Sequence, residues 1–279
     1  MPELPEVELV ARALDRHLRG RRVREALLLR PRLVPETTPE EFAAGLSGGR
    51  VREVGRRGKY ILVNLESGLT LLVHLRMTGR FLLLPPTARE LPKHTHALFT
   101  LDDGRRLAFA DQRHFGLMKL CETCGLGEAR ELRSLAPEPF SEGFSVAYLA
   151  SALARSRRTL KETLLDQTKV CGLGNIYAAE ALHRARANPF DVAAEFPRRR
   201  VASLRRAVLE VLAEAIAHGS TLNVDPEDIE SGYFGGGYGG RWRVYAREGE
   251  PCPRCRSAIE RRTQGGRSTF FCPRCQGSA

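Results

Sequence analysis

Residues 252–275 read CPRCRSAIERRTQGGRSTFFCPRC, with two Cys-x-x-Cys pairs separated by the sixteen residues 256–271. This is the spacing of a four-cysteine zinc ribbon, in which the thiolates complete a tetrahedron and leave no open position for chemistry. The sequence therefore predicts one structural zinc ion bound by Cys252, Cys255, Cys272 and Cys275. Such an ion contributes to folding rather than to catalysis.

The charge of the chain indicates a polyanionic partner. The formal net charge is +11, and residues 241–279 hold nine arginines against three acidic residues. An excess of this size favours nucleic acid over a membrane surface. No apolar run reaches membrane-spanning length, and the start MPELPEVE carries charges where a signal peptide needs an apolar stretch. We therefore expect a cytoplasmic protein without a membrane partner. A further pair, Cys121 and Cys124, is interpreted as incidental.

The first half of the chain has the pattern of a β-sandwich or barrel entered through one helix. Apolar positions at helical spacing predict a helix over 5–18. Short apolar runs separated by turn signals then predict strands, and Asp103-Gly104 marks a hairpin turn. The predicted strands are 60–65, 69–75, 80–84, 96–101 and 106–110.

The second half has helical periodicity, so the fold class is α+β with several domains. Helices are predicted over 145–155, 159–168, 175–186 and 198–218. Residues 133–145 have the composition of a linker. The predicted domains are 1–132, a β-sandwich; 133–245, a helical domain; and 246–279, the zinc finger.

The N-terminus carries a candidate nucleophile. Trimming of Met1 would expose the secondary amine of Pro2, which could attack a sugar C1′ and form a cationic iminium. Glu3 could then protonate the sugar oxygen. Taken alone, Met-Pro is more often an ordinary terminus.

Lysine is rare in this chain. Five of the 44 basic residues are lysines, and Lys59 follows two arginines in the segment RRGKY. An ammonium kept among guanidinium groups indicates a specific task, with an exposed strand-edge lysine as the alternative. The other four, Lys93, Lys119, Lys161 and Lys169, are interpreted as incidental.

Several motifs in sequence order make the chain similar to a known family. They are PELPEVE (2–8), RRGKYIL (56–62), HLRMTGR (74–80), DQRHFG (111–116), LLDQTKVCGLGNIYAAE (164–180) and the four-cysteine finger. In this order they resemble the formamidopyrimidine-DNA glycosylases (Fpg/MutM), and the resemblance spans the whole chain. It implies a catalytic domain over 1–132 with an N-terminal helix and a β-sandwich, and a helical DNA-binding domain over 133–245 whose helix–two-turns–helix lies within 164–180. An ordinary αα corner is the alternative for that last segment.

The resemblance also implies a bifunctional glycosylase and lyase. Pro2 would be the Schiff-base nucleophile, and Glu3 would be the acid that helps to open the sugar. Lys59 would approach the lesion and transfer protons. Arg267 would contact phosphate and take part in the second elimination, although a guanidinium is a poor acid at neutral pH.

The implied partner is damaged double-stranded DNA, bound by a monomer. A glycosylase must flip its target base out of the duplex. By the resemblance, Met77, Arg113 and Phe115 would occupy the vacated stack, whereas residue type alone would assign Met77 and Phe115 to a core. The remaining implied DNA contacts are His74, His94, Arg158 and Asn175, and those implied for lesion recognition are Glu6, Thr221 and Tyr233.

Three positions depart from the family pattern: Arg76 replaces a glycine, and Gln112 and His114 replace proline and arginine. The leading hypothesis is excision of oxidised purines such as 8-oxoguanine and formamidopyrimidines, followed by β,δ-elimination. PELPEVE and the segment 219–234, which the family uses to cover a flipped 8-oxoguanine, favour it; the glycine-rich run 235–240 leaves the choice of substrate open. Two alternatives remain, an endonuclease-VIII-like enzyme for oxidised pyrimidines and a non-catalytic zinc-ribbon DNA-binding protein.

Overall fold

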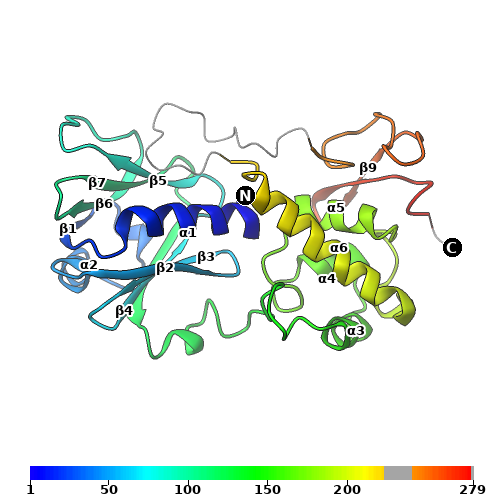
Figure 1. The fold of residues 1–279 in the computed structure, drawn as a ribbon, viewed down its shortest axis with the longest axis horizontal. Helices are drawn as coiled ribbons and strands as arrows, with labels where there is room; N and C mark the ends of the chain where they lie inside the picture. The colour runs from blue at the N-terminus through cyan, green and yellow to red at the C-terminus, as the bar shows by residue number, and fades with distance from the viewer. Residues whose placement is uncertain (223–240, 278–279) are drawn as a thin grey trace. The chain divides into compact units, whose positions relative to one another are not determined.

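The computed structural model describes residues 1–222 and 241–277, which form two compact units (Figure 1). The N-terminal unit contains Met1–Arg133, and the C-terminal unit contains Ser134–Thr221 together with 241–277. Among the described residues, no helix is long and apolar enough to cross a membrane. The division into three domains at 132/133 and 245/246 stays a prediction.

The N-terminal unit is a β-sandwich of two four-stranded antiparallel sheets, as predicted. The strand orders are β1-β6-β7-β5 and β2-β3-β4-β8. Helix α1 packs against β2 and β3 (Figure 1). The elements are α1 (Leu4–Leu18), β1 (Val23–Leu28), η1 (Pro31–Leu33), α2 (Pro39–Leu46), β2 (Val51–Arg57), β3 (Tyr60–Leu65), β4 (Leu69–His74), β5 (Gly79–Leu84), β6 (Thr95–Leu101), β7 (Arg106–Asp111), β8 (Leu117–Glu122) and η2 (Leu126–Glu128).

All five predicted strands are present, and three further strands and one helix were not anticipated. β1, β2 and β8 contain charged residues between their apolar positions, which weakens the alternating pattern. Helix α2 did carry a recognisable start signal. Thr38 and Glu41 form a capping box around Pro39, with the Thr38 hydroxyl accepting from the backbone N–H of Glu41 at 3.2 Å.

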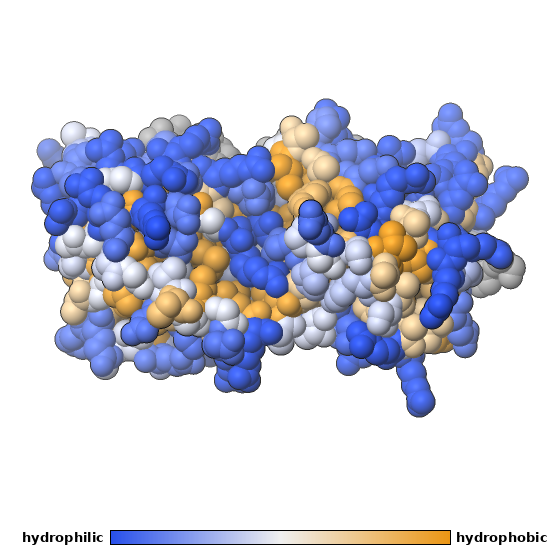
Figure 2. All heavy atoms as spheres, turned by 60° about the horizontal axis from the view of Figure 1, so that its bottom comes forward, coloured by the Kyte–Doolittle hydropathy of each residue, from blue (hydrophilic) through white to orange (hydrophobic). Residues whose placement is uncertain are grey.

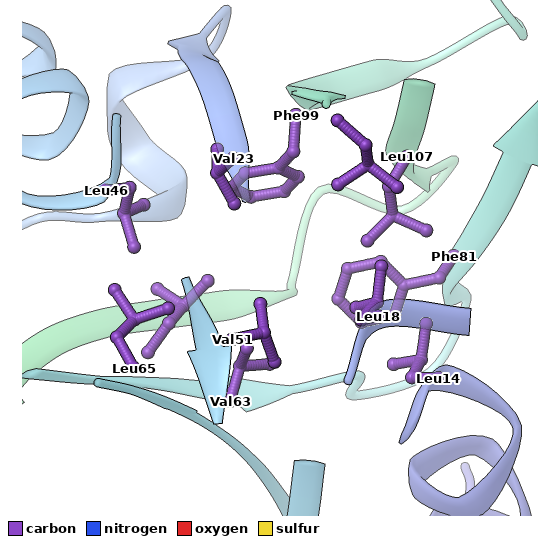
Figure 3. A pocket seen from close by; sticks show the side chains of 12 residues that line it. Leu14, Leu18, Val23, Leu46, Val51, Val63, Leu65, Phe81, Phe99 and Leu107 are labelled. Atoms are coloured by element: carbon purple, nitrogen blue, oxygen red, sulfur yellow. The ribbon is translucent and has the colours of Figure 1, made fainter. Parts of the chain in front are cut away.

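The core of this unit lies between the two sheets and under α1. Side chains from α1, α2 and both sheets converge on a cavity of about 30 Å³ (Figure 3). Its lining is entirely apolar, so the cavity offers a water molecule no hydrogen-bond partner and is expected to be dry. The lining residues are Leu14, Leu18, Val23, Leu46, Val51, Val63, Leu65, Leu71, Phe81, Phe99, Leu101 and Leu107.

The C-terminal unit is helical and ends in a β-hairpin. Its elements are α3 (Val146–Ala154), α4 (Leu160–Leu165), α5 (Asn175–Arg184), η3 (Ala193–Glu195), α6 (Arg198–Ala217), β9 (Glu260–Gln264) and β10 (Arg267–Phe271). The helix predicted over 159–168 is shorter than expected. Asp166 ends it, because its carboxylate accepts from the backbone N–H and hydroxyl of Thr168 at 3.0 and 2.8 Å.

The segment 133–145 is more than a linker, because it contributes to the core of the C-terminal unit. The side chain of Phe144 is fully buried, and its carbonyl oxygen accepts a hydrogen bond from the guanidinium of Arg205 on α6. Because Pro, Glu and Ser dominate this segment, its composition gave no indication that Phe144 is part of a core.

Candidate active site and metal centre

The residues that follow Met1 are buried at the start of α1. Pro2, Glu3 and Glu6 all lie inside the unit, and the two glutamates are 2% and 1% exposed. Glu3 is the N-cap, and its backbone N–H donates to a carboxylate oxygen of Glu6 at 2.8 Å. The partial positive charge of a helix N-terminus stabilises carboxylates at this position. Two acidic groups are thereby held beside the terminal amine.

The amine of Met1 has an unusual electrostatic environment. Burial lowers its pKa, the carboxylates of Glu3 and Glu6 raise it, and the cations of Lys59 and Arg113 lower it, with a net lowering. A lowered pKa increases the fraction of free base, which is the nucleophilic form of an amine. The N-terminal unit thus gathers four of the predicted site residues around its terminus.

Lys59 lies in the turn between β2 and β3 and is 6% exposed. This burial excludes the alternative of an exposed strand-edge lysine. Gly58 precedes it with φ +57°, a conformation that glycine adopts without strain. The turn brings Lys59 beside the paired residues Tyr60 and His74, whose rings are in edge contact at 4.7 Å.

His74 is a buried, neutral imidazole. Burial lowers its pKa to about 3, with smaller contributions from Arg76 and Lys59. Its Nδ1 accepts a hydrogen bond from the backbone N–H of Arg76 at 2.9 Å, so the proton of the neutral ring must be on Nε2. Arg76 has φ +54°, the left-handed region, at the position where the family pattern has glycine. His74 can therefore offer a neutral N–H donor but no charge.

Asp111 shapes the loop 111–116 and was not identified from the sequence. It is 1% exposed and accepts from the Thr78 hydroxyl and from the backbone N–H groups of Arg113 and Gly116, at 3.2 and 2.7 Å. Burial opposes its charge, but these hydrogen bonds hold the pKa of Asp111 below its usual range. Thr78 also accepts from the N–H of Arg113 at 3.0 Å, so the turn containing Met77 is tied to this loop.

The loop presents Phe115 to solvent with its side chain 51% exposed, which excludes the alternative of a core residue. The Arg113 guanidinium lies 5.0 Å from the centroid of the Phe115 ring. Met77 is half-buried in the turn between β4 and β5. A Cβ at Gly116 would lie 2.9 Å from the Phe109 ring, so only glycine fits after Phe115.

His114 in this loop and His94, a predicted DNA contact, lie next to each other. His94 is exposed with φ +61°, and its ring is in edge contact with that of His114. His114 in turn stacks on His96, with its Nδ1 2.9 Å from Nε2 of His96. His114, which stands where the family pattern has an arginine, is therefore packed against His94 and His96.

In the C-terminal unit, two predicted phosphate contacts share one open cleft of about 380 Å³. Arg158 and Arg267 both line it, and Arg158 lies 3.8 Å from Asp166. Asn175 lies outside the lining; its side-chain amide donates to the backbone carbonyl of Ser268 at 3.0 Å. The helix–two-turns–helix and the β9–β10 hairpin thus meet at a cleft lined by two arginines and two acidic residues, Glu162 and Asp166.

The interpretation of Lys161 as incidental is wrong. Lys161 is 1% exposed, and its ammonium donates to the carbonyl of Ser268 at 2.9 Å and to the hydroxyl of Thr269 at 2.7 Å. It holds β10, the strand that begins at Arg267, against α4. The scarcity of lysine in this chain could have indicated that Lys161 has a specific role.

The sequence also gave no indication of the role of Glu180. This carboxylate, 3% exposed on α5, accepts from three successive backbone N–H groups, those of Arg243, Val244 and Tyr245, at 2.9–3.0 Å. Glu180 thereby fixes the chain just before the finger.

The four finger cysteines are assembled as a metal site. Their Sγ atoms all lie within 4.8 Å of one another, with Cys252–Cys275 at 3.9 Å and Cys255–Cys272 at 3.4 Å. Tetrahedral Zn–S bonds of about 2.3 Å imply sulfur separations of about 3.8 Å. In addition, the backbone N–H of Cys275 points at the sulfur of Cys272 at 3.3 Å. The donor set fits one structural zinc ion.

Two predicted lesion-recognition residues lie after α6. Thr221 is half-buried and is followed by Leu222, the last described residue before the gap. Tyr233 and the run 235–240 lie outside the described residues. On the face drawn in Figure 2, hydrophilic side chains cover most of the surface and apolar ones form smaller patches, as expected for a chain with a net charge of +11.

A β-sandwich with buried carboxylates at the start of its first helix, a helix–two-turns–helix and a four-thiolate finger together define a class of zinc-finger DNA glycosylases. Family models match all three parts: the formamidopyrimidine-DNA glycosylase N-terminal domain at 1–118, the formamidopyrimidine-DNA glycosylase H2TH domain at 135–225, and the zinc finger found in FPG and IleRS at 249–277. The chain belongs to the formamidopyrimidine-DNA glycosylase (Fpg/MutM) family of base-excision repair glycosylases.

Curated relatives and solved structures are similar over their full lengths. The formamidopyrimidine-DNA glycosylases of Desulforamulus reducens and Caulobacter vibrioides are 42% and 43% identical, over 99% of this chain and 99% and 100% of theirs. The MutM (Fpg) structure from Thermus thermophilus has a TM-score of 0.86 at 40% identity, covering 100% of both chains. A Lactococcus lactis Fpg complex with DNA containing an abasic site has a TM-score of 0.90 at 32% identity, covering 99% of this chain and 100% of that one.

Proposed function

We propose that this chain is a bifunctional glycosylase and lyase that excises oxidised purines from double-stranded DNA as a cytoplasmic monomer. Pro2 is its nucleophile, and β,δ-elimination follows base removal. The observation that carries this proposal is the cluster of Glu3, Glu6, Lys59 and Arg113 around the terminal amine. A non-catalytic zinc-ribbon protein would not need a buried lysine and two buried carboxylates at this point.

In the proposed reaction, the amine of Pro2 takes over the surroundings of Met1 once Met1 is removed. Its free base attacks C1′ while the bond from C1′ to the damaged base breaks and the base leaves. Glu3 protonates the sugar oxygen, so the ring opens to an iminium. The iminium withdraws electrons, a C2′ proton is lost, and the C3′–O bond breaks. Lys59 transfers protons in these steps.

The loop residues supply base capture. Phe115 enters the base stack as a wedge, Met77 fills the space of the flipped nucleotide, and Arg113 hydrogen-bonds the orphaned partner base. The hydrogen bonds of the Thr78 hydroxyl with Asp111 and with the backbone N–H of Arg113 support these roles. They connect the turn that carries Met77 to the loop that carries Arg113 and Phe115.

Phosphate contacts are proposed in both units. The cleft lined by Arg158 and Arg267 supports anion binding there, and Arg267 is also assigned to the second elimination. The proposal keeps the domain functions predicted for 1–132, 133–245 and 246–279. The further DNA contacts are His74, His94 and Asn175, and the lesion-recognition residues are Glu6, Thr221 and Tyr233.

Borohydride trapping on DNA containing 8-oxoguanine tests this proposal. A reduced covalent adduct should map to the N-terminal peptide, and extra residues fused ahead of Pro2 should abolish the adduct because an amide nitrogen has no available lone pair. Glu3→Gln should lose base excision far more than DNA binding. An adduct that survives N-terminal blockage would instead assign the chemistry to Lys59.

Oxidised pyrimidines are a second candidate substrate class. One related structure, 33% identical with a TM-score of 0.90, is that of wild-type Lactococcus lactis Fpg in complex with DNA containing an oxidised pyrimidine. Others contain FAPY-dG or carbocyclic 8-oxo-G DNA. Single-turnover excision rates on matched duplexes carrying 8-oxoguanine or an oxidised pyrimidine separate the two classes, and a faster pyrimidine reaction would reverse our assignment.

A further inference from the structure

Helix α5 connects the helix–two-turns–helix to the zinc finger through buried side chains. Ala179 packs in an apolar cluster with Cys252 and Cys272. One helical turn further on, His183 is 1% exposed, and its Nε2 lies 3.4 Å from Sγ of Cys252. The helix that begins at Asn175 therefore ends against a predicted zinc ligand.

The surroundings of His183 decide which ring nitrogen carries the proton. Its Nδ1 is buried and has no hydrogen-bond partner among the described residues. A proton on Nδ1 would leave a buried N–H donor unsatisfied and would turn the Nε2 lone pair towards the electron-rich sulfur. A proton on Nε2 avoids both costs, so Nε2–H donates to Cys252.

This donor differs in origin from the donor to the neighbouring Cys272. The sulfur of Cys272 accepts from the backbone N–H of Cys275, which belongs to the finger itself. The donor to Cys252 comes from α5, 69 residues away in sequence. His183 thus connects helix α5 to one of the four cysteines that would bind the metal.

We propose that His183 helps the finger to retain its zinc ion by donating a hydrogen bond to the Cys252 thiolate. This hydrogen bond slows the attack of soft electrophiles on the Cys252 sulfur. A thiolate is the nucleophilic form of cysteine, and a hydrogen bond withdraws part of its charge. Outer-shell donors of this kind also orient the ligands of a metal. This inference depends on the four-thiolate site alone and holds whether or not the chain is a lyase.

Alkylation of the purified zinc-loaded protein, without DNA, tests the inference. Iodoacetamide forms an S–C bond with a thiolate and releases iodide; the zinc that loses this ligand is measured with a coloured chelator. His183→Phe keeps the ring volume but removes the donor, and it should release zinc about tenfold faster, the lower end of outer-shell effects on metal sites. His183→Gln keeps an N–H donor and should release zinc at nearly the wild-type rate.

His218→Phe, at an exposed histidine after α6, is the matched control and should not change the rate. Equal rates for wild type and His183→Phe would overturn the inference. Equal acceleration by Phe and Gln would also overturn it, since packing rather than the donor would then be responsible. Peptide mapping of the wild-type protein gives a check that does not depend on any variant: Cys252 should be alkylated late among the four, and first alkylation at Cys252 would contradict the protection.

Discussion

At the scale of single residues, burial sets the charge state of His74. His74 is neutral because its imidazole is buried and faces the cations of Arg76 and Lys59. Its ordinary pKa of 6.5 is lowered to about 3 on folding. Between pH 6.5 and pH 3, His74 is therefore protonated in the unfolded chain but neutral in the folded chain. The free energy of unfolding falls as the pH is lowered through this range.

His74→Gln should make the N-terminal unit less sensitive to acid. Between pH 7.5 and pH 5.5, the His74 contribution to the free energy of unfolding falls by about 1 kcal/mol in the wild type, and Gln has no such contribution. Thermal unfolding at the two pH values measures the difference. The control, His218→Gln, changes an exposed histidine. An identical loss of stability in wild type and His74→Gln would contradict the buried neutral state.

Phe115→Ala should slow capture of a damaged base in duplex DNA. Insertion of the ring offsets an unstacking cost of roughly a few kcal/mol per base step. On single-stranded DNA carrying the same lesion, less stacking is broken and the loss should be much smaller. Single-turnover kinetics on both substrates provide the measurement. Phe140→Ala is matched in exposure, 50% against 51%, and should change neither rate; equal losses on both substrates would remove the wedge role from Phe115.

At the scale of elements, the β9–β10 hairpin depends on contacts from the helices of its own unit. Lys161 on α4 and Asn175 on α5 both donate to the carbonyl of Ser268. Gln264 donates to the hydroxyl of Thr159 at 2.6 Å, just ahead of α4. These polar contacts fix the strand that begins at Arg267, so they also fix one wall of the cleft that Arg158 and Arg267 line.

Lys161→Met should loosen this hairpin while the N-terminal unit remains folded. Hydrogen bonds from a charged donor contribute roughly 1.5–3 kcal/mol each, and methionine fills the space without replacing them. Hydrogen exchange should become faster at Arg267–Phe271, and DNA affinity should fall. Lys93→Met removes the same charge from an exposed position and serves as control. Unchanged protection in the hairpin would show that Lys161 does not hold it.

At the scale of the whole molecule, the excess of arginine should govern DNA affinity through phosphate neutralisation. Each neutralised phosphate adds about −0.9 to the slope of log K against log salt concentration. Arg158→Gln and Arg267→Gln should each reduce the slope by about 0.9, whatever the DNA sequence. Fluorescence anisotropy on undamaged duplex over a salt series measures this. Arg206→Gln, with its side chain 73% exposed on α6, is the charge-matched control. A slope unchanged by both cleft variants would exclude the cleft from phosphate binding.

The sequence alone determined the features that depend on local spacing. The four-cysteine finger follows from two pairs of neighbours and one interval, and the predicted strands and helices follow from the period of their apolar residues. These signals fail where charged residues interrupt the period, as in β1, β2 and β8, because a partner strand rather than the local pattern fixes such segments. The order of motifs, with PELPEVE at one end, was enough to indicate the family.

Only the tertiary structure decided how the candidate site is held together. Lys161 reaches Ser268 across 107 residues, His183 reaches Cys252 across 69, and Thr78 reaches Asp111 across 33. Each of these pairs depends on burial and on hydrogen-bond geometry between segments far apart in the chain. Folding removes water from such groups, so each polar group must find a partner inside the protein. Which partner it finds is set by the packing of whole elements, and the spacing of neighbouring residues does not contain that information.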